Sequence, residues 1–357
     1  MAELDAEWTM FQNQLTHNTL SVNSLLLKDD NSKIDIPKCS DIYISTQTKI
    51  AYLNSIIKLY DIFWKLVVMD YHKQEEGIIK KSIKINCNTV EEAKILDEKI
   101  KSTKNIDVNI LSQVNNPNAR KVKFKDIRKI DVGLSKKDLI SYRKKKKGAF
   151  YNCFAIILRV FYKGVFKEVH VKIFNTGKLE IPGIQFDELL IITLDKLITI
   201  LKPLVGDNIS YNKNDISTVL INSNFSCRFF IDRFKLYEIL KTKYNISAAY
   251  DPCSYPGIQC KFHYNKFNKE HKGFKVTNDK KSEEYESAWQ HISFMIFRTG
   301  SVLIVGNCNS SVLHIIYNWL KKILKKEYTN ICICNNTTVK KKTAKKIRKK
   351  TLLFTVE

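Results

Sequence analysis

Hydrophobic and polar residues alternate along two stretches of the chain that share one plan. In residues 168–174 (EVHVKIF), valine and isoleucine stand at every second position, which is typical of a strand with one buried face. The NTGK that follows, at 175–178, is typical of a hairpin turn, and KLEIP continues as a second strand. Residues 291–306 (HISFMIFRTGSVLIVG) repeat this plan. We therefore predict a β-hairpin in each stretch.

A helical pattern follows each hairpin. In the first copy, apolar residues recur with the spacing of one helix face, at Leu190, Leu194, Leu197 and Leu201. The second copy has its stripe 123 residues later, at Leu313, Tyr317, Leu320 and Leu324. We expect the first helix to end at Pro203, because proline lacks the backbone N–H that continues a helix.

The two hairpins belong to a longer repeat. IFNTGKLEIPG (173–183) and IFRTGSVLIVG (296–306) are identical at six of eleven positions, with an offset of 123. Upstream, KLYDI (58–62) matches KLYEI (235–239) with an offset of 177. The two offsets differ by 54 residues (177 minus 123), so the first copy carries an insertion of about that size. We place it within residues 73–147.

A strand-like run and an N-cap residue precede each upstream match. The runs are 41–53 and 217–231, and the predicted N-caps are Ser55 and Asp232. Each copy is therefore predicted as strand, helix, strands and helix. Two such units can form one antiparallel sheet with all helices on one side and the other face open.

Composition adds a charge imbalance to this picture. The 357 residues include 60 Lys and Arg against 36 Asp and Glu, a net charge of +24, and 44% are hydrophobic. A folded protein with this charge favours a polyanionic partner, with nucleic acid ahead of an anionic membrane. A compositional bias toward Lys, Ile and Asn, as AT-rich genomes produce, is the alternative explanation.

Other signals argue against several classes of function. The start MAELDAEWTM has no apolar leader, and nine cysteines is an odd number, so we expect reduced thiols in an intracellular compartment. The run LLIITLDKLITIL (189–201) is broken by Asp195 and Lys196 and is too short for a membrane span. No P-loop, HExxH or standard zinc spacing occurs. We expect no enzyme activity, metal, cofactor, small-molecule substrate or membrane partner.

The duplicated motifs resemble those of the TATA-box-binding protein family, and most closely the divergent members of nucleocytoplasmic large DNA viruses. The motifs that carry the resemblance are IFNTGK (173–178) with Gly183, IFRTG (296–300) with Gly306, and YPGIQCKF (255–262). The resemblance covers roughly 39–72 and 148–334. It implies an α+β saddle of two pseudo-symmetric repeats, with one curved antiparallel sheet and helices on its convex side.

The resemblance also implies how such a saddle works. The open sheet face enters the minor groove of DNA, and aromatic wedges part base steps and kink the duplex. The residues that match the wedges are Phe154, Phe174, Tyr255 and Phe297. Phe150 or Tyr151 takes the place of Phe154 if the alignment shifts. Judged without the resemblance, strand aromatics such as these are more often core residues.

The groove floor is expected to differ between the repeats. Leu303 and Val305 match the apolar residues of the last strand. Their counterparts Glu180 and Pro182 should also face outward, where a carboxylate is unfavourable beside phosphates. The family also has an asparagine on the first strand of each repeat. The residues near those positions here are Ile42 or Tyr43, and Val219 or Leu220.

Basic residues near the strands and toward the end of the sequence are candidates for phosphate contacts. They are Lys144, Lys145, Lys146, Lys178, Arg298, Lys345, Lys346 and Arg348. The last three belong to KKKTAKKIRKK (340–350), which is also typical of a nuclear import signal or of a solvated tail.

The repeats divide the chain into four predicted parts. These are an N-terminal arm (1–38), repeat 1 with its insertion (39–206), repeat 2 (207–334) and a basic C-terminal tail (335–357). The resemblance implies a DNA-binding transcription initiation factor that bends promoter DNA and recruits a transcription factor IIB-like factor or RNA polymerase. The alternative is a protein-interaction module of a viral transcription complex with little sequence-specific DNA binding. A viral factory in the host cytoplasm, the host nucleus and the virion are the expected locations.

Overall fold

A computed structural model describes residues 35–140, 150–268, 270–275 and 283–333. The chain divides into residues 1–38 and a compact unit over 39–357, and the fold below is that of the described part of the second unit. Six of the predicted phosphate contacts lie outside the described residues: Lys144, Lys145, Lys146, Lys345, Lys346 and Arg348.

The first half of this unit runs from strand β1 to helix α5. Its elements are β1 (Tyr43–Tyr52), α2 (Leu59–Lys65), β2 (Gly77–Cys87), α3 (Val90–Lys101), β3 (Ile106–Asn115), β4 (Phe124–Gly133), α4 (Lys136–Ile140), β5 (Cys153–Tyr162), β6 (Val165–Phe174), β7 (Lys178–Ile184) and α5 (Asp187–Val205). The second half follows a short 3-10 turn. Its elements are β8 (Ser217–Ser226), α6 (Arg233–Thr242), β9 (Ser247–Ala249), β10 (Gly257–Asn265), α7 (Glu283–Ser287), β11 (Trp289–Phe297), β12 (Ser301–Gly306), α8 (Ser310–Lys326) and α9 (Tyr328–Ile331).

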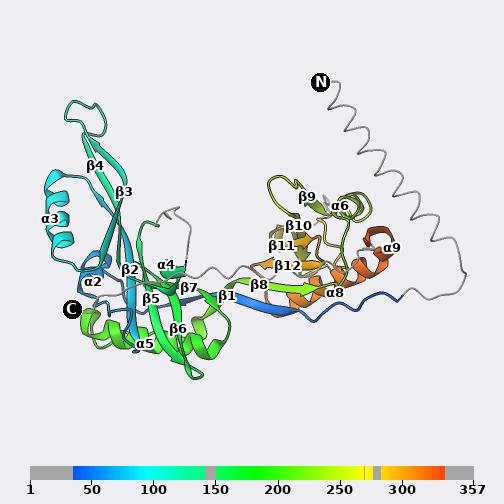
Figure 1. The fold of residues 1–357 in the computed structure, drawn as a ribbon, viewed down its shortest axis with the longest axis horizontal. Coiled ribbons are helices and arrows are strands. Elements are labelled where there is room, and N and C mark those ends of the chain that lie inside the picture. Colours follow the sequence, from blue (N-terminus) through cyan, green and yellow to red (C-terminus); the bar gives the residue numbers. More distant parts are fainter. Residues whose placement is uncertain (1–34, 141–149, 269, 276–282, 334–357) are drawn as a thin grey trace, which may run out of the picture. The chain divides into compact units, whose positions relative to one another are not determined.

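All the strands join one antiparallel sheet, as the sequence pattern predicted. Their order is β3-β4-β2-β5-β6-β7-β1-β8-β12-β11-β10-β9 (Figure 1). Outward from the central β1–β8 pair, β7-β6-β5-β2 mirrors β12-β11-β10-β9. The sheet order therefore repeats the duplication found in the sequence.

The extra elements of the first half lie between β2 and β5. Strand β2 pairs with β5 in the same way that β9 pairs with β10, so β2 is the counterpart of β9 and not part of the insertion. Helix α3, strands β3 and β4 and helix α4 have no counterpart in the second half, where only residues 250–256 join β9 to β10. We therefore assign the insertion to residues 88–152, a narrower and later segment than the predicted window.

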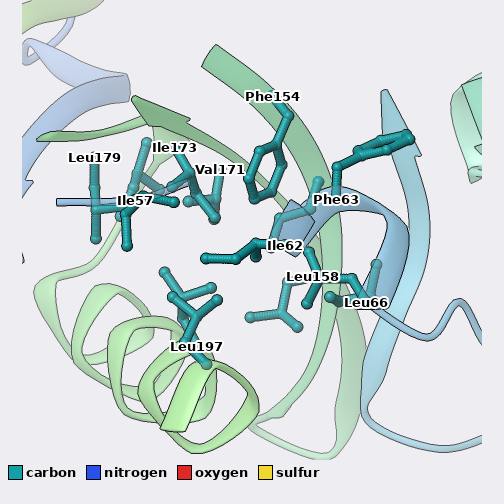
Figure 2. Packing of buried hydrophobic residues seen from close by; sticks show 14 of the residues in the cluster. Ile57, Ile62, Phe63, Leu66, Phe154, Leu158, Val171, Ile173, Leu179 and Leu197 are labelled. Carbon is teal, nitrogen blue, oxygen red and sulfur yellow. The ribbon is translucent and has the colours of Figure 1, made fainter. Parts of the chain in front are cut away.

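Two apolar cores hold the repeat helices on one face of the sheet. Both predicted helical stripes are buried: Leu190, Leu194, Leu197 and Leu201 in one core, and Leu313, Tyr317, Leu320 and Leu324 in the other. Figure 2 shows Leu197 of α5 pointing toward the strand residues Val171 and Leu179. We call the opposite side of the sheet the open face. The repeat helices therefore lie on one side, as expected, whereas the short insertion helix α4 contacts side chains of the open face as described below.

Two local predictions about helix ends need correction. Asp232 caps α6, because its carboxylate accepts from the Phe234 and Lys235 backbone N–H groups, as predicted. Ser55 caps no helix, because α2 begins only at Leu59 and Lys58 takes the N-cap position. Helix α5 continues past Pro203 to Val205 without the hydrogen bond that a residue other than proline would donate there, and the Gly206 N–H caps the Lys202 carbonyl at 2.9 Å.

A buried lysine ties β2 to α2 and was not predicted. The Lys81 ammonium donates to the carbonyls of Phe63 and Leu66 at the end of α2, both at 2.7 Å. Lys81 is 4% exposed, and this burial lowers the pKa of its ammonium to about 8. The cation occupies the negative end of the helix dipole, which offsets part of its desolvation cost.

This burial predicts a dependence of stability on pH. Between about pH 8 and the unfolded pKa of about 10.4, the unfolded chain keeps a proton that folded Lys81 has lost, so rising pH favours the folded state. The unfolding free energy of wild type should therefore rise through this window relative to Lys81→Met. Urea titrations from pH 7 to 10.5 test this, with exposed Lys94→Met as the matched control. Parallel pH profiles of wild type and Lys81→Met would contradict it.

Candidate nucleic-acid interface

Strand alternation decides which side chains reach the open face. On β7, Leu179 and Ile181 are fully buried against the helices, so Glu180 between them points the other way. On β12, Val302 and Ile304 are fully buried and Leu303 is on the open face. Pro182 and Val305 follow the same alternation. All four residues, Glu180, Pro182, Leu303 and Val305, therefore point to the open face, as the sequence predicted.

The centre of the open face carries side-chain amides that the sequence analysis missed. On β8, the Asn222 amide donates to the Thr46 hydroxyl at 3.0 Å, and the Asn224 amide donates to the Ser45 hydroxyl at 2.7 Å. The two asparagines pair across the strands with Val305 and Leu303. The two asparagines alternate along β8 with the buried residues Ile221, Ser223 and Phe225, and this alternation is the pattern that places them on the open face. The residues proposed for this role, Val219 or Leu220, lie earlier on the strand.

Repeat 2 brings its two predicted wedge residues together at one end of the open face. The ring centres of Tyr255 and Phe297 are 6.0 Å apart, and both side chains are partly exposed. Gly257 makes this approach possible. A Cβ on Gly257 would lie 3.0 Å from the Phe297 ring and 3.1 Å from the Tyr255 ring. Any other residue at Gly257 would press on both rings, which would have to shift by a few tenths of an ångström.

The register of repeat 1 identifies a different first aromatic. Phe174 pairs with Cys153 across β5 and β6, as Phe297 pairs with Gly257 across β10 and β11. Because Tyr255 stands two residues before Gly257, its counterpart stands two residues before Cys153 and is Tyr151. The Tyr151 side chain is 52% exposed, and the Lys84 ammonium lies 3.5 Å from its ring centre.

The prediction of Phe154 as a wedge is therefore wrong. Phe154 pairs with Ile173, which faces the helices, so its side chain is fully buried in the core. Its ring packs edge-on against Phe63 of α2, with centres 6.1 Å apart (Figure 2). Of the two alternatives, Phe150 is also exposed, but Tyr151 has the matching register.

Charged groups occupy the open face of repeat 1. The Lys172 ammonium lies 2.6 Å from the Glu180 carboxylate, so the carboxylate predicted to oppose DNA is paired. Nearer the outer end, Arg159 is 6% exposed and donates to the Tyr71 carbonyl at 3.0 Å and to the Lys73 carbonyl at 2.5 Å. The chain between α2 and β2 therefore packs against this face.

Helix α4 of the insertion also contacts this face. Lys80 of β2 bonds Asp138 at 2.9 Å, and the backbone N–H of Lys136 donates to Glu168 of β6 at the same distance. Hydrogen bonds from Ser135, together with Lys80, lower the pKa of Asp138 despite its burial. The outer part of repeat 1 is therefore a paired, partly covered surface.

Repeat 2 lacks carboxylates on this face. Strands β8, β10, β11 and β12 contain no aspartate or glutamate. Their open face combines amides, hydroxyls, apolar side chains and the exposed Lys261 with the Tyr255–Phe297 pair. Of the predicted phosphate contacts in the described residues, Arg298 is exposed beside this pair, and Lys178 lies 5.7 Å from the Phe174 ring centre.

Among the residues that the structure describes, no three His, Cys, Asp or Glu side chains are grouped so that they could hold a metal ion. Within the same residues, no helix has both the length and the apolar composition needed to cross a membrane.

Comparisons with known proteins give a sequence relative and a structural neighbour. No family model matches the chain. A TATA-box-binding protein-like protein of Acanthamoeba polyphaga mimivirus is 26% identical over 196 residues, which are 52% of this chain and 50% of the relative. The match therefore spans about half the length of that relative. Among solved structures, Methanococcus jannaschii TBP aligns with 80% of this chain and 99% of its own, at 13% identity and a TM-score of 0.38. The chain has an α+β fold of two pseudo-symmetric repeats on one antiparallel sheet, and it resembles a divergent viral TATA-box-binding protein-like protein.

Proposed function

We propose that this protein binds duplex DNA in the minor groove through its open face, bends it, and acts in the initiation of viral transcription. The observation that carries the proposal is the partly exposed Tyr255–Phe297 pair at the end of a face whose strands contain no Asp or Glu. Apolar side chains inserted between base steps unstack and kink DNA, and amides such as Asn222 and Asn224 can donate to minor-groove acceptors. The absence of carboxylates from the strands of repeat 2 avoids repulsion from phosphates.

The proposal gives the two faces of the sheet different partners. DNA would occupy the open face, while the helix face would contact a transcription factor IIB-like factor or RNA polymerase. Exposed lysines on α8, such as Lys322, Lys325 and Lys326, are available there. The protein would act inside the host cell, in a viral factory or the nucleus, or be carried in the virion.

A second function is favoured by the paired charges of repeat 1. Lys172, Glu180 and Arg159 already have partners on the open face, and α4 packs beside them. A face of this kind is consistent with a protein-interaction module that makes little sequence-specific contact with DNA. The two functions differ in one measurable property, which is bending.

Fluorescence transfer between dyes at the two ends of a duplex measures that bend. Wild type should bend A·T-rich and G·C-rich duplexes in a salt-sensitive manner, and Phe174→Ala/Phe297→Ala should lose the bend. The control Phe161→Ala/Phe166→Ala removes two exposed aromatics at the opposite end of β5 and β6, and it should bend DNA as wild type does. Binding without bending, equal in all three proteins, would favour the interaction module.

A further inference from the structure

The insertion in repeat 1 carries a basic hairpin that the two-repeat fold does not require. We infer that the β3–β4 hairpin is a second DNA-contacting element, which binds the phosphate backbone of duplex DNA outside the segment held by the two repeats. This inference rests on the proposed function and deepens it. It is carried by the position of the hairpin, its charge and the face on which that charge lies.

The strand register places the tip of the hairpin beyond the end of the sheet at which Tyr151 lies. Ile83 of β2 pairs with both Phe154 of β5 and Ile130 of β4, so these residues are level across the strands. Strand β4 begins six residues earlier, at Phe124, which is roughly 20 Å further along at about 3.3 Å per residue. Tyr151 precedes β5 at the same end. The turn at 116–123 therefore projects past the repeat-1 wedge, on strands that extend the sheet beyond β2 (Figure 1).

The projecting part carries only positive charge. Residues 115–125 (NNPNARKVKFK) contain four cationic side chains and no Asp or Glu. The four are Arg120, Lys121, Lys123 and Lys125. Three of them are exposed and Lys125 is partly exposed. Such a group neutralises phosphates without reading base sequence.

Alternation puts the strand lysines on the open face. Asp126 and Arg128 of β4 point to the helix side, where Arg128 contacts Asp97 of α3. Lys125 and Lys129 must therefore point to the open side, as does Lys84, which pairs with Lys129. Lys129 is neutralised there by Asp131, 2.8 Å from its ammonium, and the Lys84 ammonium lies over the Tyr151 ring. Lys84 and Lys125 thus place positive charge between the wedge and the hairpin tip on the face proposed to meet DNA.

Ion pairs at its base and hydrogen bonds at its tip hold the hairpin in this position. At its base, Arg128 binds Asp126 at 2.6 Å and also contacts Asp97, and Asp126 is fully buried. At its tip, the Asn116 N–H donates to the Lys123 carbonyl at 2.8 Å, and the Asn116 side chain accepts from the Asn118 N–H at 3.1 Å. Asp126 and Asp97 are thus paired with Arg128 at the base, and an ordered turn presents the cations.

The test compares a long duplex with a minimal one. The hairpin variant replaces the four tip cations by glutamine: Arg120→Gln/Lys121→Gln/Lys123→Gln/Lys125→Gln. A matched variant removes four exposed lysines from the helix side: Lys235→Gln/Lys322→Gln/Lys325→Gln/Lys326→Gln. Affinity is measured across a salt series on a 60-bp duplex and on a duplex cut to the bent segment, with hydroxyl-radical footprints on the long one.

We expect the salt dependence of affinity to be weaker for the hairpin variant than for wild type on the long duplex only. The slope of log affinity against log salt should fall by about 0.9 for each phosphate contact removed, and the footprint should shorten on one flank. The minimal duplex should still be bound and bent as by wild type. An unchanged slope and footprint on the long duplex, or an equal loss on both duplexes, would overturn the inference while leaving bending intact. If wild type neither binds nor bends DNA, the proposed function fails as well.

Discussion

Phe154→Ala is expected to lower the free energy of unfolding by about 3–5 kcal/mol, because it empties a fully buried ring position in the core of repeat 1. Tyr151→Ala, three residues away, should lower it by no more than about 1 kcal/mol, because an exposed ring with one cation contact contributes little to the fold. The two variants should affect DNA bending in the opposite order. Tyr151→Ala should weaken the bend, whereas Phe154→Ala at a temperature where it stays folded should keep it.

Urea unfolding followed by circular dichroism gives the first quantity, and end-to-end fluorescence transfer on bound DNA gives the second. Phe154→Leu serves as the control, because it keeps most of the apolar volume and should recover most of the lost stability. A Phe154→Ala protein with wild-type stability and a lost bend would restore Phe154 as the wedge and contradict the register argument.

The duplication and the sheet could be predicted because they rest on periodicity. The period-2 pattern of 168–174 and the leucine stripe beginning at Leu190 each need only local sequence, and their constant offset reveals the repeat. The facing of Glu180 and Leu303 followed from the same alternation. Features of this kind survive sequence divergence because burial enforces them at every second or every third to fourth position.

The features that could not be predicted depend on which strands pair. Three aromatics precede or begin β5, at 150, 151 and 154, and alternation alone cannot say which one faces outward. The pairing of Cys153 with Phe174 decides it. Likewise, Lys81 is a buried cation only because β2 packs beside the end of α2. A one-residue change of register would exchange the two faces of such a strand.

Similar reasoning explains why the insertion was placed too early. The offset arithmetic gave its size but could not exclude β2, whose counterpart β9 has only three residues and no sequence similarity to it. Helix α4 was missed because it is a five-residue helix with no buried residue, so it leaves no apolar pattern in the sequence. Its contacts with Lys80 and Glu168 are long-range and polar.

Exchanging residues between the repeats should shift DNA affinity in opposite directions. Leu303 and Glu180 are equivalent positions, 123 residues apart, and both face the open side. Leu303→Glu would place a carboxylate on the carboxylate-free strands of repeat 2 without disturbing the buried Val302 and Ile304 beside it. Repulsion from a nearby phosphate, at roughly 1–4 kcal/mol, predicts a loss of about 5- to 1000-fold in affinity.

Glu180→Leu should have the reverse effect, because it removes a carboxylate from the face and frees Lys172, now 2.6 Å from Glu180, to reach a phosphate. Fluorescence anisotropy on one A·T-rich duplex measures both changes.

Leu303→Gln separates charge from size, because it has nearly the volume of glutamate and no charge, and it should cost far less affinity than Leu303→Glu. Raising the salt should narrow the difference between the two, since salt screens the repulsion. Equal losses for Leu303→Gln and Leu303→Glu would mean that steric fit, not charge, governs this face. Wild-type binding by Leu303→Glu would place the DNA elsewhere on the protein.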